Sequence, residues 1–462
     1  MIFKKPTLMK TKFVFCAALS CLTHVSYAAV SAEEAKQLGQ SLTLFGAIKA
    51  GNSSGSIPPY TGGLTKPPVG FNPGSGVWTD PYKDEKPLFR IDAKNLAQHS
   101  ERLSEGQKQL LTKFPTYYID VYPTHRSTAY PESVLKATVR NATGCQAKKD
   151  GEAVESHCRG GMPFPIPKTG REAMWNQLLS YRGDTGSVTE NSRSWVIDST
   201  GRPIMTAEQK TLSDFPYYQT EQADRDTNMV WRTYSYTKSP ARRAGEMTGL
   251  TDFTDPKDKP RRAWTYTPGQ RRVKRSPEFA YDTPVASMGG VILFDELFVF
   301  SGAMDRFDFK LVGKKEMYIP YNSYRSTFEC PAPEKALLPK HANPACERWE
   351  LHRVWVIEAT LKSGQRHAYS RRTYYFDEDL SGAGMFDAFD QANELHRSLF
   401  NGTVQLYDVS MPYSTRTVVY DFKRQQYAYL NDVSQGGVTL LSEPLSERAL
   451  NPEAVVGRES AR

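Results

Sequence analysis

The strongest constraint on the fold is a series of strand-like segments between about residues 193 and 429. Each segment is rich in β-branched or aromatic residues, and most alternate apolar with polar positions, as a half-buried strand does. They cover residues 195–198, 229–237, 263–275, 291–300, 353–376 and 417–429. This pattern lacks the regular β/α alternation of a parallel sheet. We therefore predict an α+β protein with one large, mostly antiparallel sheet and a few helices on one side.

Helical patterns are short and few. Ser31 and Glu34 can form a capping box at the start of a helix predicted over 31–44. Apolar spacing predicts further helices over 93–114, 168–181, 385–399 and 444–457. Residues 46–87 are dense in Gly, Pro, Ser and Asn. We expect them to form a loop-rich N-terminal arm that runs over the surface.

Residues 261–275 are predicted to form a β-hairpin. Pro268 and Gly269 suit the central positions of a type II turn, because Pro fixes φ at about −65° and Gly accepts a positive φ. A two-residue loop would pair Thr267 with Gln270, although such loops favour primed turns that Pro268 cannot adopt. Alternation then gives a mainly aromatic face and a basic face: Trp264, Tyr266 and Val273, with Arg271 beside them, against Thr265, Arg272 and Lys274.

A second hairpin is predicted over 353–376, with Trp355 and Ile357 on one face. The acidic residues Asp377, Glu378 and Asp379 follow it and could suggest a cation site or an acid/base pair. They lack the spaced oxygen ligands of a calcium loop, so we interpret them as a solvated loop.

The first 28 residues have the pattern of a secretory signal peptide. Lysines precede the apolar run 13–22, and Ser26-Tyr27-Ala28 fits a small-x-small cleavage site. The apolar run is shorter than the roughly 20 residues of a membrane span. Lipoprotein processing at Cys21 is the less favoured alternative, because Leu19 lies one position from where that signal places it. Both readings predict export, and we expect residues 29–462 to form a single domain.

Charge and cysteine content narrow the function classes. Loss of the four leader lysines lowers the formal net charge from +8 to +4, which gives no argument for nucleic-acid binding. Two disulfides are expected in an exported chain, with three possible connectivities among Cys145, Cys158, Cys330 and Cys346. Local pairing would close loops of about 14–17 residues, each contributing about 3 kcal/mol. The cysteine spacing does not fit a zinc site.

Catalytic signatures are weak. Gly51, Ser53 and Gly55 match the G-x-S-x-G nucleophile elbow, which requires a strand before the Ser and a helix after it. A helical pattern precedes this motif, and Pro58 and Pro59 exclude a helix directly after it. No two histidines have the spacing that chelates a metal on a helix. We predict no catalytic residues, metal or cofactor, and keep an exported serine hydrolase using Ser53 as the least favoured alternative.

A basic cluster on the first hairpin is a candidate docking surface. The cluster comprises Arg261, Arg262, Arg271, Arg272, Lys274 and Arg275, and the last four are the predicted docking residues. A solvated strand face, or charges that discourage edge-to-edge aggregation, would explain them without a partner. The functional alternative is contact with lipid headgroups or an acidic partner.

Three ordered motifs resemble a Gram-negative periplasmic family, domain-of-unknown-function family 1329. They lie at 38–52 with 57–63, at 263–275 with 280–284, and at 353–362 with 374–379. The resemblance covers nearly the whole chain after residue 28. The chain departs from the family pattern at 387–397, where the family reads as a strand. It also departs at Ser53 and Ser54, where the family has an acidic residue.

The resemblance implies the fold of the LolA/LolB lipoprotein carriers, a strongly curved antiparallel half-barrel that wraps a few helices around an apolar concavity. It implies a non-enzymatic periplasmic carrier or accessory for a lipid, lipoprotein or other hydrophobic ligand, moved towards the outer membrane. The alternative is a structural partner of an inner-membrane exporter or an outer-membrane protein. The candidate ligand-lining residues are Trp264, Tyr266, Phe298, Trp355 and Ile357, although core packing alone would explain each one.

Overall fold

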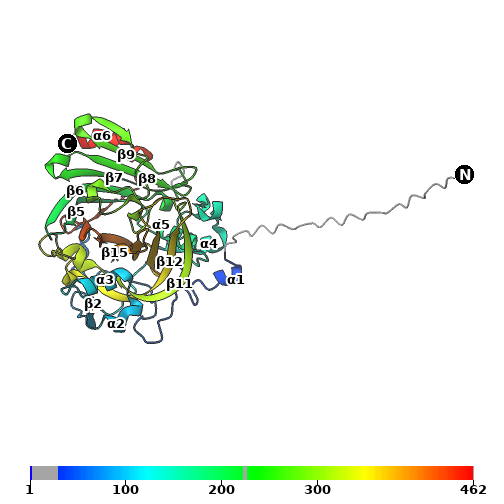
Figure 1. Cartoon of the computed structure of the whole chain (residues 1–462), viewed down its shortest axis with the longest axis horizontal. Coiled ribbons are helices and arrows are strands. Elements are labelled where there is room, and N and C mark those ends of the chain that lie inside the picture. Colours follow the sequence, from blue (N-terminus) through cyan, green and yellow to red (C-terminus); the bar gives the residue numbers. More distant parts are fainter. Residues whose placement is uncertain (3–29, 222–225, 461–462) are drawn as a thin grey trace.

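The computed structural model (Figure 1) describes residues 1–2, 30–221 and 226–460. The expected signal peptide, apart from its first two residues, and Cys21 lie outside the described residues. The helices are α1 Ala32–Ala35, α2 Leu96–His99, α3 Glu105–Lys113, α4 Glu132–Gly144, α5 Gly170–Leu178 and α6 Pro452–Ser460. Among the described residues, no helix combines the length and apolarity needed to cross a membrane.

One large open sheet dominates the described chain. Its strands are β1 Phe89–Ile91, β2 Ile119–Val121, β5 Ser187–Ile197, β6 Pro203–Asp214, β7 Met229–Ser239, β8 Met247–Phe253, β9 Arg262–Thr267, β10 Arg272–Arg275, β11 Phe307–Pro320, β12 Trp349–Leu361, β13 Arg371–Asp377, β14 Gly384–Phe389, β15 Leu395–Leu406, β16 Met411–Asp421, β17 Gln426–Asp432 and β18 Thr439–Leu440. A separate two-stranded sheet joins β3 Ala147–Lys148 and β4 Ala153–Val154.

The strand order in the large sheet is β1-β2-β12-β13-β14-β15-β16-β17-β5-β6-β7-β8-β9-β10, with β11 on β12 and β18 on β5. Its pairings in the described chain are antiparallel, apart from one parallel bridge between β2 and β12. This confirms the predicted α+β class with a strongly curved, mostly antiparallel sheet. Figure 1 shows α6 against β7–β9 at one end of the molecule and α2 and α3 beside β2 at the other.

Both faces of the sheet carry apolar side chains, and two main cores result. One core joins α4, α5 and residues 285–304 to residues of β12–β17 such as Ile357 and Leu399. The other places Leu110 and Leu111 of α3, with both cysteines Cys330 and Cys346, against further strand residues. Burial on both faces explains why β14 is buried at every position, Asp387 included.

The helix predicted over 385–399 is wrong, because this region forms β14 and β15. Its Met, Ala, Glu and Leu content favours a helix locally. The segment nevertheless lies between β13 and β16, whose backbones pair with it along its length. Asn393, with a φ of 59°, makes the turn between the two strands. Tertiary pairing has overridden local propensity here.

The strand predicted over 291–300 is also wrong. This region belongs to no strand of the sheet, and Phe294–Glu296 forms a 3-10 turn. Its apolar side chains are buried in the core as an irregular segment. A short apolar run indicates burial, but it does not by itself distinguish a strand from another buried segment.

Two predicted helices are shorter than expected, and one was missed. The capping box of Ser31 and Glu34 is present, but α1 ends at Ala35. The helix predicted over 93–114 breaks before Ser104, which begins α3 with a second capping box. Helix α4 follows Pro131 and was not predicted. Between α1 and β1 the described chain has no further helix or named strand, so residues 46–87 form a loop-rich arm.

The first hairpin forms, but its register is shifted by two residues. Thr267 pairs with Arg272 and Tyr266 with Val273. The loop has four residues, Pro268–Gln270 plus Arg271 in the left-handed region at a φ of 48°. Because a shift of two preserves which side chains share a face, Trp264, Tyr266 and Val273 remain together.

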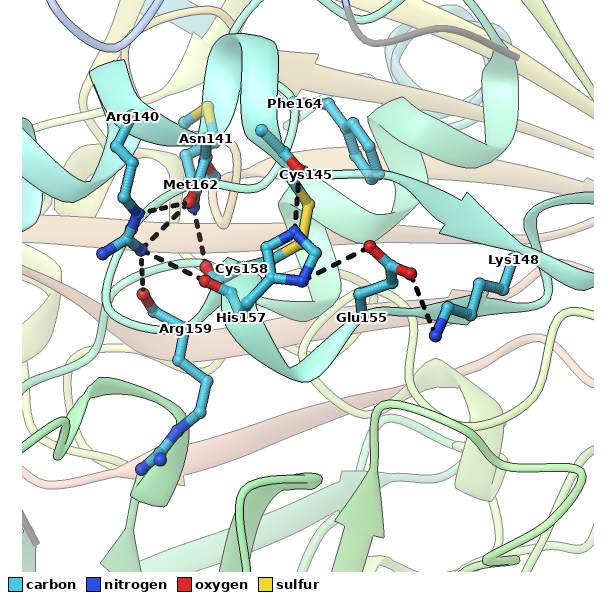
Figure 2. Close-up of a disulfide and its surroundings, with 12 residues drawn as sticks. Arg140, Asn141, Cys145, Lys148, Glu155, His157, Cys158, Arg159, Met162 and Phe164 are labelled. Carbon is cyan, nitrogen blue, oxygen red and sulfur yellow. Dashed lines mark hydrogen bonds and ion pairs between the residues drawn. A yellow bond between two sulfur atoms is a disulfide. The ribbon is translucent and has the colours of Figure 1, made fainter. Parts of the chain in front are cut away.

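Both disulfides connect cysteines that are close in sequence, Cys145 with Cys158 and Cys330 with Cys346. Figure 2 shows the first, which joins the end of α4 to the turn at residues 156–158. His157 contacts the Gly144 carbonyl through Nε2 at 2.7 Å, and the side-chain amide of Asn141 donates to the Cys158 carbonyl at 2.7 Å. The predicted pair of disulfides is confirmed, with local connectivity.

The prediction of a solvated loop at Asp377, Glu378 and Asp379 is wrong, because all three are buried. Arg126 donates to both carboxylate oxygens of Asp379, at 2.7 and 2.6 Å. Glu378 accepts from the Ile48 backbone at 3.2 Å. These contacts fasten the N-terminal arm to the end of β13, so the first and third sequence motifs meet in one buried charge cluster.

His352 lies between two carboxylates of this cluster. Its ring nitrogens are 3.2 Å from Glu350 and 3.1 Å from Asp377. Burial alone would lower the pKa of His352, but Asp377 and Glu350 outweigh burial and raise it to about 9. Burial by itself would raise the pKa of Glu350, whereas His352 and Arg348 lower it to about 2. The imidazole is therefore protonated in the folded protein at neutral pH.

We expect folding stability to fall between about pH 6.5 and pH 9. The folded-state pKa of His352 exceeds its ordinary value of 6.5. Its contribution is therefore fully present below pH 6.5 and is lost as pH rises through 9. Urea unfolding across this range should show a loss of roughly 2–3 kcal/mol, and His352→Gln should remove most of this dependence. Parallel pH profiles for the two proteins would contradict the assignment.

Candidate functional site

A continuous row of hydroxyl side chains crosses five neighbouring strands of the sheet. Cross-strand pairing places Thr189 opposite Thr211, Thr211 opposite Ser235, Ser235 opposite Thr248, and Thr248 opposite Thr265. Because paired residues in an antiparallel sheet point to the same face, these five side chains lie side by side. We call them the hydroxyl row. All five line one cavity of about 380 Å³.

A second row extends the polar wall of this cavity. Ser187 pairs with Ser213, and Ser213 pairs with Thr233. The hydroxyls of Ser213 and Thr233 are 3.1 Å apart, as are those of Thr211 and Ser235. These hydroxyls are only partly satisfied by one another, since each can donate one hydrogen bond and accept two. The wall can therefore accept a polar group of a ligand.

The opposite wall is apolar and comes from an irregular segment, residues 279–304, which we call the cover. Its lining residues include Phe279, Val285, Ile292, Phe294, Leu297 and Phe298. Val285 and Ile292 are joined by a backbone hydrogen bond of 2.9 Å, and Gly289 and Gly290 make the turn between them with φ of 68° and 69°. A Cβ at Gly289 would approach Val196 of β5 to 2.4 Å, so Gly allows the cover to lie close to the sheet.

Asp295 of the cover is fixed to the sheet by a buried ion cluster. Its carboxylate is 2.9 Å from His367 and 3.0 Å from Arg372. Burial alone would raise the pKa of Asp295, but Arg372 and His367 outweigh it and hold the pKa well below its usual range. The Arg372 guanidinium is fully buried and also lies 4.4 Å from the centre of the Phe307 ring. Asp295 is the only carboxylate within 4.0 Å of it in the described chain.

Glu296 adds a second anchor. It accepts a hydrogen bond from the Tyr369 hydroxyl and lies 3.6 Å from Arg397. Arg397 in turn contacts Asp421 of β16 at 3.1 Å. Burial raises the pKa of Glu296 despite the attraction of Arg397. Two adjacent acids thus attach the cover to β13, β15 and β16.

Phe298 forms part of the cavity wall and is held on two sides. The Trp231 ring meets it edge-on at 5.3 Å, and the Arg182 guanidinium lies 4.0 Å from its ring centre. Phe298 and Val299 both adopt a positive φ, 55° and 76°. Such values are unfavourable for bulky and β-branched residues, so the surrounding packing must hold this turn in place.

The five predicted lining residues occupy different places. Phe298 lines the cavity. Tyr266 also borders it, but its side chain lies on the same face as Trp264 and packs against the core on that face. Trp264 instead packs with Tyr234, Met247 and α6 residues on the opposite face of the sheet. Trp355 and Ile357 belong to the main core outside this cavity. Trp264 therefore supports the hydroxyl wall from the opposite face of the sheet. The cavity side of the first hairpin carries hydroxyl groups, whereas an aromatic face was expected there.

Sequence reasoning missed the hydroxyl row, although its signal is visible. Thr and Ser recur two residues apart in four of the strands β5 to β9, at 187 and 189, 211 and 213, 233 and 235, and 265 and 267. The intervening positions carry larger apolar residues such as Leu212 and Tyr234. In the first hairpin the alternation separates an aromatic face from a basic face that carries Thr265, and the predicted lining residues of this hairpin come from the aromatic face. Only the positions of the cover and α6 decide between these two faces.

The other candidate sites have simpler explanations. Ser53 is exposed in a turn with no helix after it, so the geometry of a nucleophile elbow is absent. His352, Asp377 and Asp379 have possible ligand atoms within 4.8 Å of one another, but Arg126 and Glu350 already pair with this group. A depression of about 680 Å³ beside β11–β13 has a mixed lining that includes the charged residues Lys314, Lys315, Glu358 and Arg371.

Replacing Asp295 with Asn should destabilise the protein by about 3–5 kcal/mol, because the buried Arg372 loses its charge partner. Urea unfolding measures this change in the free energy of unfolding. Asp308→Asn, at an exposed position that forms no ion pair with any described residue, is the matched control and should change stability by less than about 0.5 kcal/mol. Equal effects of the two substitutions would refute the anchoring role.

Comparisons with known proteins place the chain in a family. Residues 90–455 match the family described as "Protein of unknown function (DUF1329)". An uncharacterized protein of Pseudomonas aeruginosa is 38% identical over 418 residues, covering 89% of this chain and 90% of that protein.

Two solved structures are more distantly similar. A DUF1329 family protein from Desulfovibrio piger has a TM-score of 0.40 at 14% identity, covering 60% of this chain and 93% of its own. A LolA superfamily protein from Nitrosomonas europaea has a TM-score of 0.36 at 10% identity, covering 62% and 99%. The sequence match spans most of the chain, and this protein therefore belongs to the DUF1329 family.

Proposed function

We propose that this protein is a non-enzymatic periplasmic carrier for an amphipathic molecule, such as a lipid or the lipid part of a lipoprotein, on its way towards the outer membrane. The observation that supports this most directly is the two-sided chemistry of the cavity. One wall is the hydroxyl row with its neighbouring hydroxyls, and the other is the apolar cover. The signal-peptide pattern of residues 1–28 supports the periplasmic location.

The two walls suit the two parts of such a ligand. An apolar chain packed against Phe294, Leu297 and Phe298 would gain about 0.8 kcal/mol for each buried methylene group. A carbonyl, ester or hydroxyl group would exchange hydrogen bonds with the opposite wall. Arg243 and Glu246 are the only charged lining residues in the described chain, and they pair with each other at 2.8 Å. The cavity thus favours an uncharged polar group inside.

The cover is the element that would have to move for loading. It has few backbone hydrogen bonds to the sheet and is held by side-chain contacts: at Asp295 and Glu296, between Arg261 and Ser301, and between Thr206 and the Ser287 carbonyl. The two glycines at 289 and 290 lie at its far turn, next to β5 and β6. Displacement of this turn, with the acidic anchor kept in place, would open the cavity without breaking the buried ion cluster.

The proposal predicts saturable binding of a fluorescent fatty-acid probe to delipidated protein. Ser235→Phe should weaken binding at least tenfold, because the new ring occupies the centre of the hydroxyl row. Thr360→Phe, at an exposed position of β12 outside the cavity, is the matched control and should bind as the parent does. Circular dichroism would check that both variants fold. Absence of saturable binding, or undiminished binding by Ser235→Phe, would refute the proposed site.

A further inference from the structure

Five cations lie together at one end of the sheet without partners. They are Arg242 in the turn between β7 and β8, and Arg271, Arg272, Lys274 and Arg275 at the tip of the first hairpin. We call them the basic rim. All five are exposed, and none forms an ion pair or side-chain hydrogen bond with any residue of the described chain. Of the eight other exposed arginines in the described chain, four have such partners, as Arg90 does with Asp120 at 2.7 Å.

The basic rim lies beside the cavity. Gly245 of the β7–β8 turn approaches Pro268 of the hairpin loop so closely that a Cβ there would lie 2.7 Å from the proline ring. The two turns that carry the cations are therefore in contact. Arg243, Glu246 and Thr267, from these same turns, line the cavity. Lys274 also pairs with Thr265 and so continues the hydroxyl row by one strand.

Protection of the sheet edge does not account for the whole rim. Strand β10 is the last strand of the sheet, and charges on it discourage pairing with another chain. Arg242, however, lies in a turn away from this edge. Within the hairpin, Lys274 and Arg275 point to opposite faces, because neighbouring strand residues alternate.

The positions of the five cations also favour binding to a broad anionic surface over binding of a single anion. Cations on both faces of a hairpin and in a second turn do not converge on one phosphate group. They can all approach an extended anionic surface at once. The partner that is complementary in charge and extent to the basic rim is therefore an anionic bilayer.

We propose that the basic rim docks the protein on a membrane surface that carries anionic lipid headgroups, with the cavity beside the bilayer. This inference concerns an interaction surface and does not depend on the identity of the carried molecule. Each cation near an anionic surface strengthens binding about fivefold. Five such cations give useful but reversible attachment, which suits a protein that must leave the membrane. The attraction is electrostatic, so it weakens as salt shortens the screening length.

Vesicle co-sedimentation of the full chain tests the proposal. Vesicles of phosphatidylglycerol mixed with phosphatidylcholine should bind the protein, and vesicles of phosphatidylcholine alone should not. The triple variant Arg271→Gln, Arg272→Gln and Lys274→Gln should bind the anionic vesicles about 100-fold more weakly. The matched control Lys66→Gln, Lys83→Gln and Lys86→Gln removes three exposed lysines of the N-terminal arm and should retain binding within about twofold.

The cavity variant separates this proposal from the carrier function. Ser235→Phe should still bind anionic vesicles, because the cavity-filling ring leaves the rim intact. Equal binding to both vesicle types, or an equal loss in the rim and control triples, would overturn the membrane-docking assignment. Loss of vesicle binding in Ser235→Phe alone would also overturn it, because attachment would then pass through the cavity.

Discussion

The alternation of side chains across strands β5 to β9 gives the two faces of this part of the sheet different chemistry. Hydroxyl side chains predominate on the face that lines the cavity, and residues such as Leu212, Tyr234 and Trp264 pack on the other face. The apolar face needs a cover of its own, which α6 and the preceding segment provide through Leu450 and Val455. Because α6 takes that face, the hydroxyl face is left to meet the cover and form the cavity. One helix therefore determines the chemistry of the site on the far side of the sheet.

Buried ion clusters fix the irregular segments around this sheet. The cluster at Arg126, His352 and Asp379 holds the N-terminal arm, and the one at Asp295 and Arg372 holds the cover. Buried ion pairs give little net stability compared with well-packed apolar residues, but loss of one partner is strongly destabilising. In this protein the clusters fix position, because each one holds a loop without regular secondary structure in a single place against the sheet. Sequence motifs from distant parts of the chain converge at the first cluster for this reason.

Small residues allow the close approaches that these arrangements require. A Cβ at Gly249 would lie 2.1 Å from the Trp264 indole nitrogen, so the indole can cover the strand only because this position is glycine. A Cβ at Gly170 would approach the Phe309 carbonyl oxygen to 2.4 Å, which is how the start of α5 can pack on β11. Both contacts support the walls of the sheet rather than the cavity itself. The aromatic residues that stand out in the sequence thus serve mainly as structural support.

The class of fold, the presence of two disulfides and the residues that share a face in the first hairpin could all be predicted from the sequence. These are local properties, since strand alternation, cysteine spacing and turn residues act over a few positions along the chain. Tertiary structure decided which face became the cavity, why residues 385–399 became strands, and why Asp377 to Asp379 are buried. Each of these depends on a partner distant in sequence: α6 for the face, β13 and β16 for the strands, and Arg126 for the acids. The periodicity of a segment does not show which distant segment will pack against it.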